Sequence, residues 1–289
     1  MEFRRILLPF DFSEAAEYAA RYAGGLAAFF GAEVTMMHVL PQMQYDFSLA
    51  EPLPGRLQEV RKHRTANARQ ALKAVMPCLG EAAATARIEV TEGGAAEEIL
   101  SAANSSLFDA VVMSTRGAST FRRLFTIGSV TSKVLHEAEP PVITSVHFED
   151  QRFPPSIHRV LCAVDLGPQT MRVLDWGSRA AVTFGASLQI VHVASDPGIL
   201  ASDEEAGQWR SSACRRLTAR IQELQNELAM EGAIHIAFGN PAKAISALAA
   251  DSHADLVVLG RGVAHDMIGR LRATAYDIIR QCPCPVASI

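Results

Sequence analysis

Three small residues late in the first half of the chain are suited to holding a phosphate group. Gly117 lies in a loop that follows the apolar run 111–113. Gly128 and Ser129 come directly before a segment, 130–137, whose apolar positions recur at helical spacing. The first N–H groups of a helix have no intrahelical acceptor, and the helix dipole places partial positive charge beside them. A glycine lets the backbone approach an anion and a serine adds a hydroxyl donor, so this pattern indicates a phosphate site.

The segments around this loop are expected to alternate between strands and helices. The run from Ile6 to Phe10 is continuously apolar, which indicates a strand covered on both faces, as in a parallel sheet. Ser13 is a good N-cap for a helix that Gly31 ends. In the first half the expected strands are 6–10, 34–39, 87–90, 110–113 and 141–146, and the expected helices are 13–30, 56–75, 95–104 and 130–137. Within the helix at 56–75, the expected buried positions are Leu57, Val60, Ala68, Ala71, Leu72 and Val75.

The same pattern restarts in the second half of the chain. Asp11 corresponds to Asp165, which lies 154 positions later and also follows an apolar run. From the third expected strand onward the separation falls to 146, as between Asp109 and Asp255. A separation that stays constant across several elements indicates a duplicated unit.

The repeat predicts two domains, residues 1–148 and 157–289, joined by a polar linker with two prolines at about 149–156. Because strands alternate with helices, each domain is expected to be a doubly wound α/β unit. The expected fold class is α/β, with two tandem five-stranded parallel α/β sandwich domains related by a pseudo-two-fold. Ligands in such sheets bind at the carboxyl ends of the strands, and the phosphate-type loop follows the fourth strand at this edge.

The composition is that of a globular protein and argues against several classes. Apolar residues make up 49% of the chain and the net charge is −4, and neither half is basic enough to suggest a surface for nucleic acid. The five cysteines lack metal-ligand spacing, so we expect incidental thiols, a reducing compartment and no metal site. No apolar run approaches the roughly 18 residues of a membrane span, and the N-terminal run is too short for a signal sequence. The sequence predicts a soluble, cytoplasmic protein without a nucleic-acid or membrane partner.

Both halves resemble universal stress protein domains over nearly the whole chain. The resemblance rests on the Asp after the first strand, the Gly-Ala and His-Val around the second, the Asp-Leu-Val-Val strand, and the glycine loop that closes on Gly-Ser-Val. In nucleotide-binding members this loop reads Gly, two residues, Gly, nine residues, Gly, then Ser or Thr, and it holds the phosphates of ATP. The Asp and the Val after the first two strands contact adenine and ribose. The resemblance implies an ATP site, with Mg²⁺ as the accompanying ion, formed by Asp11, Val39, Ser114, Arg116, Gly117, Gly128, Ser129 and Val130.

The first half departs from the family pattern twice. Ser114 replaces the first glycine of the loop, and ten residues rather than nine separate Gly117 from Gly128. Serine restricts the approach of backbone to a phosphate, and the extra residue either forms a local bulge or changes the register of the loop.

The second half departs further, so we expect its site to be degenerate for ATP. Arg272 and Ala273 stand where the first half has Gly128 and Ser129, when the two halves are aligned on their last Pro-Val pair. Arg272 could pair with an anion as a fork, or it could form a structural salt bridge with one of two aspartates, Asp266 and Asp277. The residues of this degenerate site are Asp165, Val193, Gly260, Gly262 and Arg272.

Universal stress protein domains often pair through their fifth strands, which covers exposed sheet edges. We therefore expect 142–146 to meet 286–289 as an internal pseudo-dimer, and a homodimer is a further expectation.

The leading functional hypothesis is a stress-response protein that binds an adenine nucleotide in its first half as a regulatory signal. Two alternatives stay open: a tandem stress protein that acts as a scaffold or binds another small ligand, and a slow ATPase. His38 and His192 are expected to be packed, hydrogen-bonded residues, and we assign no catalytic residue.

Overall fold

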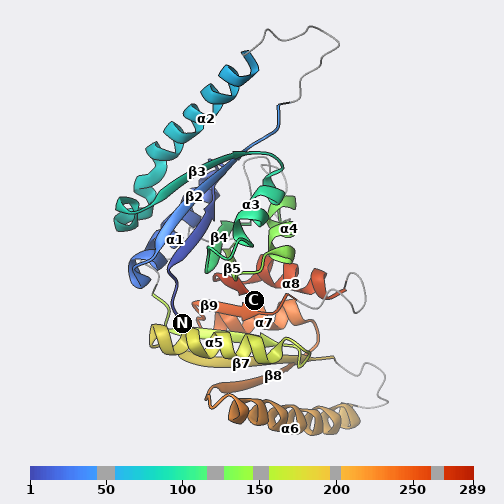
Figure 1. Ribbon diagram of the computed structural model, residues 1–289. Helices are drawn as coiled ribbons and strands as arrows, with labels where there is room; N and C mark the ends of the chain where they lie inside the picture. The colour runs from blue at the N-terminus through green and yellow to red at the C-terminus, as the bar shows by residue number, and fades with distance from the viewer. Residues whose placement is uncertain (44–55, 116–126, 146–155, 196–202, 262–269) are drawn as a thin grey trace. The chain divides into compact units, whose positions relative to one another are not determined.

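The computed structural model of this protein describes residues 1–43, 56–115, 127–145, 156–195, 203–261 and 270–289 (Figure 1). The chain divides into two compact units, one built mainly of Glu2–Thr144 and the other mainly of Ser156–Ile289. The expected pairing of the two fifth strands and the pseudo-two-fold stay predictions. Within the described residues, no helix is long and apolar enough to cross a membrane.

Strands and helices alternate along both units, as the sequence predicted. The first unit contains β1 (Arg5–Pro9), α1 (Glu14–Phe30), β2 (Glu33–Leu40), α2 (Arg56–Val75), the 3₁₀ segment η1 (Met76–Ala84), β3 (Arg87–Glu92), α3 (Ala95–Ala103), β4 (Ala110–Ser114), α4 (Ser129–Glu137) and β5 (Val142–Ser145). The second contains β6 (Arg159–Val164), α5 (Thr170–Phe184), β7 (Ser187–Ala194), α6 (Asp203–Glu227), β8 (Ala233–Phe238), α7 (Pro241–Asp251), β9 (Leu256–Leu259), α8 (Arg270–Gln281) and β10 (Val286–Ser288).

The two units have the same strand order and the same register. The order is β3-β2-β1-β4-β5 in the first and β8-β7-β6-β9-β10 in the second. Ile6 of β1 faces Val34 of the parallel strand β2, and Val160 of β6 faces Leu188 of β7, which lie 154 positions further along the chain. The parallel pairings of β1 with β4 and of β6 with β9 repeat in the same way, with 146 positions between β4 and β9. The duplication inferred from the sequence is therefore present in the strand pairing.

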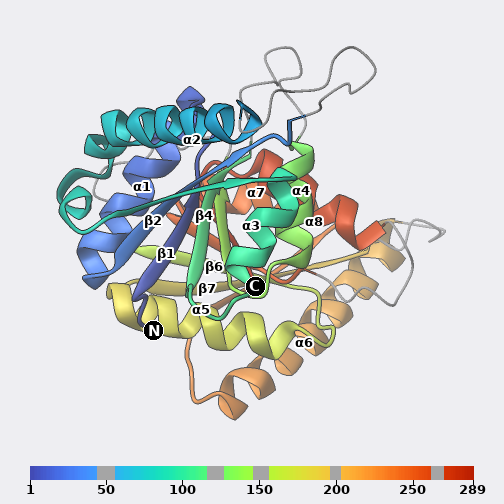
Figure 2. The ribbon, with the colours of Figure 1, turned by 45° about the horizontal axis from the view of Figure 1, so that its top comes forward.

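Helices cover both faces of the sheet in each unit. In the first unit α1 and α2 lie on one face, and α3 and α4 pack against each other on the opposite face (Figure 2). Right-handed crossovers produce this arrangement, because the strand order changes direction after β3. Ile6, Leu7 and Leu8 are fully buried, as the continuous apolar run predicted for a strand covered on both faces.

The helix boundaries in the first unit follow the predicted capping residues. Ser13 is the N-cap of α1, and Glu14 and Glu17 lie in its first turn, where the helix dipole favours acidic side chains. Gly31 ends the same helix in a left-handed conformation with φ of 66°, and its counterpart Gly185 ends α5 with φ of 64°. Both glycines adopt a backbone conformation that other residues reach at a steric cost.

The prediction for the buried face of α2 was partly wrong. Ala68 and Leu72 are buried, as expected, but Ala71 is exposed and Val60 is 41% exposed. Both buried residues lie in the second half of α2, a helix that contacts β2, β3 and η1. An apolar stripe identifies the side of a helix that can be buried. It does not say how much of that side the neighbouring elements cover.

Candidate functional site

The carboxyl end of β1 forms one side of the candidate site in the first unit. Asp11 follows this strand and is exposed. Its Oδ1 accepts hydrogen bonds from the backbone N–H of Ser13 (3.1 Å) and from the Ser13 hydroxyl (2.6 Å). Ser13 Oγ accepts in turn from the N–H of Ala16 at 3.1 Å. Asp11 is therefore not the cap itself but holds the capping serine, and Phe12 between them has a left-handed φ of 63°.

Equivalent histidines connect the ends of the first two strands in each unit. Nδ1 of His38 lies 2.7 Å from the carbonyl oxygen of Phe10, and Nδ1 of His192 lies 2.9 Å from that of Val164. A carbonyl oxygen only accepts, so each Nδ1 carries the proton and donates it. The His38 ring also contacts Phe12, with centroids 4.7 Å apart. These contacts confirm that both histidines are packed, hydrogen-bonded residues.

The connection between β4 and α4 positions the start of that helix at the same edge. The Gly128 N–H donates to the carbonyl of Thr115 at 2.9 Å, and the Thr131 hydroxyl donates to that of Ser114 at 3.1 Å. Gly128 is the N-cap, so the N–H groups of Ser129 and Val130 have no acceptor within the helix. The first turn contains no acidic residue, so no side chain of that turn opposes the positive end of the helix dipole.

Nothing in the described part of the chain requires a glycine at position 128. Its φ is −62°, which any residue adopts. A Cβ added there would lie 3.7 Å from the Thr115 carbonyl oxygen and 3.9 Å from the Thr131 hydroxyl, which are ordinary contact distances. The backbone at Gly128 is therefore not closely covered by the described residues.

The remaining predicted residues of the first site fall into two groups. Val39 is half-buried near the end of β2 and pairs in register with Thr91 of β3. Arg116 and Gly117 lie outside the described residues, so their part in the site stays a prediction.

The second unit contains a cavity of about 180 Å³ at the corresponding edge of its sheet. Three residues of the predicted degenerate site line it, namely Asp165, Val193 and Gly260, together with Thr274 of α8. These four positions correspond to Asp11, Val39, Ser114 and Val130 of the first half. The positions that the sequence grouped together therefore surround one space in the second copy.

Two residues that the sequence analysis did not single out, Gln169 and Thr170, also line this cavity. A Cβ added to Gly260 would lie 2.6 Å from Oε1 of Gln169, so the Gln169 carboxamide fills the space that the glycine leaves. The first half has Ala15 and Ala16 at the corresponding positions. The sequence did contain a signal for these two residues, because longer polar side chains replace the two alanines of the first half.

At the position that corresponds to the start of α4, α8 is already helical. Ala273 corresponds to Ser129, and the described part of α8 includes Arg270, three residues earlier. The N–H of Thr274 therefore meets the carbonyl of Arg270 within the helix, whereas Val130, its counterpart, is in the first turn of α4. The second unit does not present the corresponding amide to the cavity.

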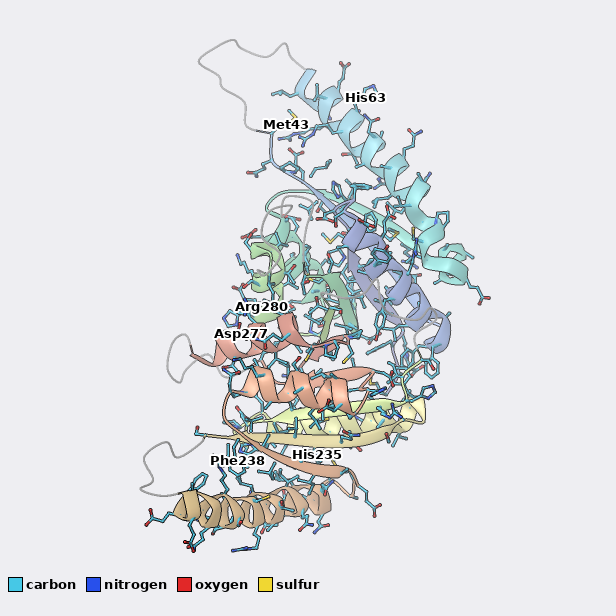
Figure 3. The ribbon with its side chains drawn as sticks, turned by 180° about the vertical axis from the view of Figure 1, so that it is seen from behind. Met43, His63, His235, Phe238, Asp277 and Arg280 are labelled. Atoms are coloured by element: carbon cyan, nitrogen blue, oxygen red, sulfur yellow. The ribbon has the colours of Figure 1, made fainter. Side chains whose placement is uncertain are left out.

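Asp277, one of the two aspartates considered as partners of Arg272, pairs with another arginine, and the Arg272 salt bridge stays a prediction. The Asp277 carboxylate accepts a hydrogen bond from Arg280 at 2.7 Å, and both residues lie on α8 (Figure 3). The side chain of Arg272 lies outside the described residues, as do Asp266 and Gly262.

Buried ionisable groups in the second unit are poorly suited to catalysis. Burial raises the pKa of the Cys162 thiol to about 12, that of Cys282 to about 12, and that of Cys284 as well. Thiols in this state are not nucleophiles at neutral pH. Burial also lowers the pKa of Arg261 to about 10, with the charge of Arg172 adding to the effect. Among the described residues, no group of three histidine, cysteine or acidic side chains could hold a metal ion.

The described units are doubly wound parallel α/β domains with an open edge at the carboxyl ends of their strands. A sequence model of the universal stress protein family matches residues 2–145 and again residues 156–289. The chain therefore belongs to the universal stress protein family and contains two tandem domains of it.

Individual relatives agree with this assignment. The chain is 34% identical over 142 residues to a universal stress protein of Thermus aquaticus, a match that covers 49% of this chain and 97% of the relative. It is 28% identical over 141 residues to one of Methanocaldococcus jannaschii, covering 49% of this chain and 81% of the relative. The crystal structure of a universal stress protein from Archaeoglobus fulgidus is similar over 98% of this chain and 97% of that chain, with 25% identity and a TM-score of 0.70.

Proposed function

We propose that the first domain binds an adenine nucleotide at the carboxyl edge of its sheet and that the bound nucleotide acts as a regulatory signal. In this proposal the triphosphate contacts the backbone of Gly128, Ser129 and Val130 at the start of α4. The nucleoside contacts Asp11 and Val39, as the family resemblance implies.

One observation carries the proposal: α4 begins at this edge with first-turn amides that have no intrahelical acceptor, and its start is fixed in place. Two hydrogen bonds, from the Gly128 N–H and the Thr131 hydroxyl, fix the helix start against the end of β4. Such a helix start binds anions, because its amides point outward and the dipole favours negative charge. The space at Gly128 has no role in packing among the described residues, and contact with a phosphate provides one.

The same residues give little support for rapid turnover of a nucleotide. Asp11 already accepts two hydrogen bonds from Ser13, so its carboxylate has a structural task at the start of α1. His38 donates to a backbone carbonyl. A cradle of amides can bind a triphosphate without a general base beside it, which favours binding over hydrolysis.

The test begins with the purified full chain. Denaturing the protein and analysing the supernatant by chromatography should release an adenine nucleotide, and calorimetric titration of the nucleotide-free protein should give heat with ATP. Gly128→Arg should abolish that heat, because the long side chain occupies the space of the phosphates. Gly128→Ala is the matched control: its Cβ has room, so it should fold normally and weaken binding only severalfold.

Each result has a defined meaning. No released nucleotide and no heat at millimolar ATP would exclude the proposal and favour the scaffold alternative. Equal ATP binding by wild type and Gly128→Arg would place the ligand elsewhere. A metal-dependent hydrolysis rate that Asp11→Ala abolishes would favour the slow ATPase, and the titrations with and without Mg²⁺ test the role of the ion.

A further inference from the structure

We propose that Glu92 is a positioning residue for the nucleoside side of the nucleotide site in the first domain. Its carboxylate holds the segment 41–43, which continues from Val39 by way of Leu40, and it does so without contacting the ligand itself. The inference rests on the proposed function, because Val39 is one of the two residues assigned to the nucleoside there.

The segment that follows β2 is held by side chains from two other elements. Residues 41–43 leave the carboxyl end of β2 without regular secondary structure. The N–H of Met43, which is labelled in Figure 3, donates to Oε1 of Glu92 at 3.2 Å. The carbonyl oxygen of Pro41 accepts from the guanidinium of Arg64 at 2.9 Å. Glu92 of β3 and Arg64 of α2 therefore set the place of this segment.

Glu92 is itself fixed between β3 and α2. It is the last residue of β3 and pairs in register with Leu40, the last residue of β2. The N–H of the next residue, Gly93, donates to the carbonyl of Leu40 at 2.9 Å. The Glu92 carboxylate also lies 3.5 Å from Nε of Arg61 and 3.8 Å from a guanidinium nitrogen of Arg64. One carboxylate thus connects a strand end, a helix and the segment after β2.

This cluster is better suited to positioning than to stabilising the domain. The side chain of Glu92 is 23% exposed and that of Arg61 is 61% exposed. Ion pairs with this much solvent contact contribute little to the free energy of unfolding. A carboxylate still fixes the backbone N–H that donates to it, because hydrogen bonds to ionised groups are shorter and stronger than neutral ones. A binding segment held in place before the ligand arrives removes an ordering cost from binding.

The second domain has an aromatic residue in place of this carboxylate. Phe238 lies 146 positions after Glu92 and pairs in register with Ala194. Its ring contacts Trp209 of α6, with centroids 5.9 Å apart, and the Arg210 guanidinium lies 6.0 Å from the ring. An aromatic ring can attach a helix in this way, but it offers no oxygen to a backbone N–H. The two domains therefore contact their long helices, α2 and α6, from the same strand position by different means.

The first test does not need a nucleotide. Glu92→Gln keeps the shape of the side chain and removes its charge, so the N–H of Met43 should exchange with deuterium severalfold faster. Glu89→Gln, three residues earlier on β3, is the matched control and should leave this rate unchanged. Hydrogen exchange resolved by segment, on the full chain, measures both. An unchanged rate in Glu92→Gln would show that the carboxylate does not hold the segment and would overturn the inference.

The second test separates the two parts of the nucleotide. In calorimetry with the full chain, Glu92→Gln should weaken ATP binding about tenfold, because the nucleoside then has to order the segment. Binding of inorganic tripolyphosphate, which contacts only the start of α4 in the proposed function, should change by less than about twofold. The melting temperature should fall by no more than about 2 °C, since exposed ion pairs contribute little.

Glu92→Phe is a second variant, which transfers the residue of the second domain to the first. The ring can lie against an α2 arginine, so the variant should fold. It removes the acceptor for the Met43 N–H, so it should weaken ATP binding at least as much as Glu92→Gln does. Gly128→Arg should abolish the binding of both ATP and tripolyphosphate, which distinguishes the phosphate side from the nucleoside side.

The outcomes separate this inference from the proposed function. Equal ATP binding by wild type, Glu92→Gln and Glu92→Phe would overturn the inference and leave the proposed function intact. Equal losses of ATP and tripolyphosphate would mean that Glu92 supports the fold of the domain as a whole, which would overturn the inference too. If the wild type gives no heat with ATP, the proposed function fails and this inference fails with it.

Discussion

The helices that follow the fourth strand of each domain, α4 and α8, show how two copies of one fold come to differ at their ligand edge. The strands before them pair in the same register, so the sheets provide the same support. However, α4 begins at Ser129, whereas α8 is already helical three residues before the corresponding position. In α8 the amides at these positions donate within the helix, whereas the corresponding amides of α4 have no acceptor within the helix. A change in helix start can therefore change ligand chemistry without changing the sheet.

A second difference lies in the connection that precedes the third strand of each sheet. In the first domain α2 is followed by η1, which packs closely against α1. The second domain is eight residues shorter here, and α6 continues to β8 without such a segment (154 − 146 positions). The first domain thus covers a face of α1 with η1, a segment that the connection between α6 and β8 does not contain.

The largest expected effect on stability concerns this packing. Gly24 of α1 has no counterpart glycine, because Ser178 occupies the position in α5. A Cβ at Gly24 would collide with the backbone carbonyl of Leu79 in η1, so Gly24→Ala should cost about 3 kcal/mol in the free energy of unfolding. Ser178→Ala should change it by less than about 0.5 kcal/mol. Urea denaturation of both variants measures this, and equal effects would mean that α1 and α5 are packed alike.

The next effect tests the comparison of the two helix starts. Ser129→Asp places a carboxylate beside the proposed phosphates and should weaken ATP binding about 30-fold, or about 2 kcal/mol. The same change favours the helix dipole, so the melting temperature should not fall. Ala273→Asp at the corresponding position of α8 should leave ATP affinity unaltered. If both variants weakened ATP equally in calorimetry, both helix starts would have to bind nucleotide.

A smaller effect depends on pH and concerns the thiols. Burial keeps Cys162 protonated in the folded protein to about pH 12, whereas an unfolded thiol loses its proton near pH 9. Above pH 9 the unfolded chain binds fewer protons, so stability falls as pH rises, by about 1.4 kcal/mol per pH unit for this group. Cys162→Ala should remove that part of the slope in denaturation between pH 9 and 10.5. Cys214→Ala, at a half-buried position, is the control, and an unchanged slope in Cys162→Ala would contradict the assignment.

The smallest effect concerns the cap of α1. Ser13→Ala removes the acceptor for the Ala16 N–H and should cost about 1 kcal/mol, whereas Ser13→Thr should retain most of the stability. No side-chain hydrogen bond caps α5, so the loss should be confined to the first domain. Hydrogen exchange resolved by segment can check this. Ser13→Ala should increase the exchange rate in α1 relative to wild type, and an equal increase in α5 would show that the effect of the cap is not local.

Much of the fold was predictable because its signals are local. The helix bounded by Ser13 and Gly31 has a capping residue at each end, and both residues adopt the expected conformations. The 3₁₀ segment η1 was not predicted, since its sequence around Pro77 and Gly80 lacks a regular apolar period. It packs against α1 around Gly24, and a contact between residues so far apart in the chain leaves no local signal.

The sequence predicted which residues belong together, but not how they contact one another. The family resemblance and the repeat grouped Asp165, Val193 and Gly260, and the structure places these three residues around the second-domain cavity. The pairing of Gly260 with Gln169 could not be read from either residue alone. It depends on how closely α5 approaches the end of β9, which is a tertiary property.

The shared register makes the two domains interchangeable at the level of single segments. Residues 115–141 and 261–285 connect equivalent strands, so one segment can be grafted onto the sheet of the other domain. In such a chimaera the helix start of the first domain would sit above the threonine and glutamine of the second. The chimaera could bind charged or uncharged compounds preferentially. That preference would show whether the grafted backbone or the side chains of the receiving domain determine selectivity in this fold.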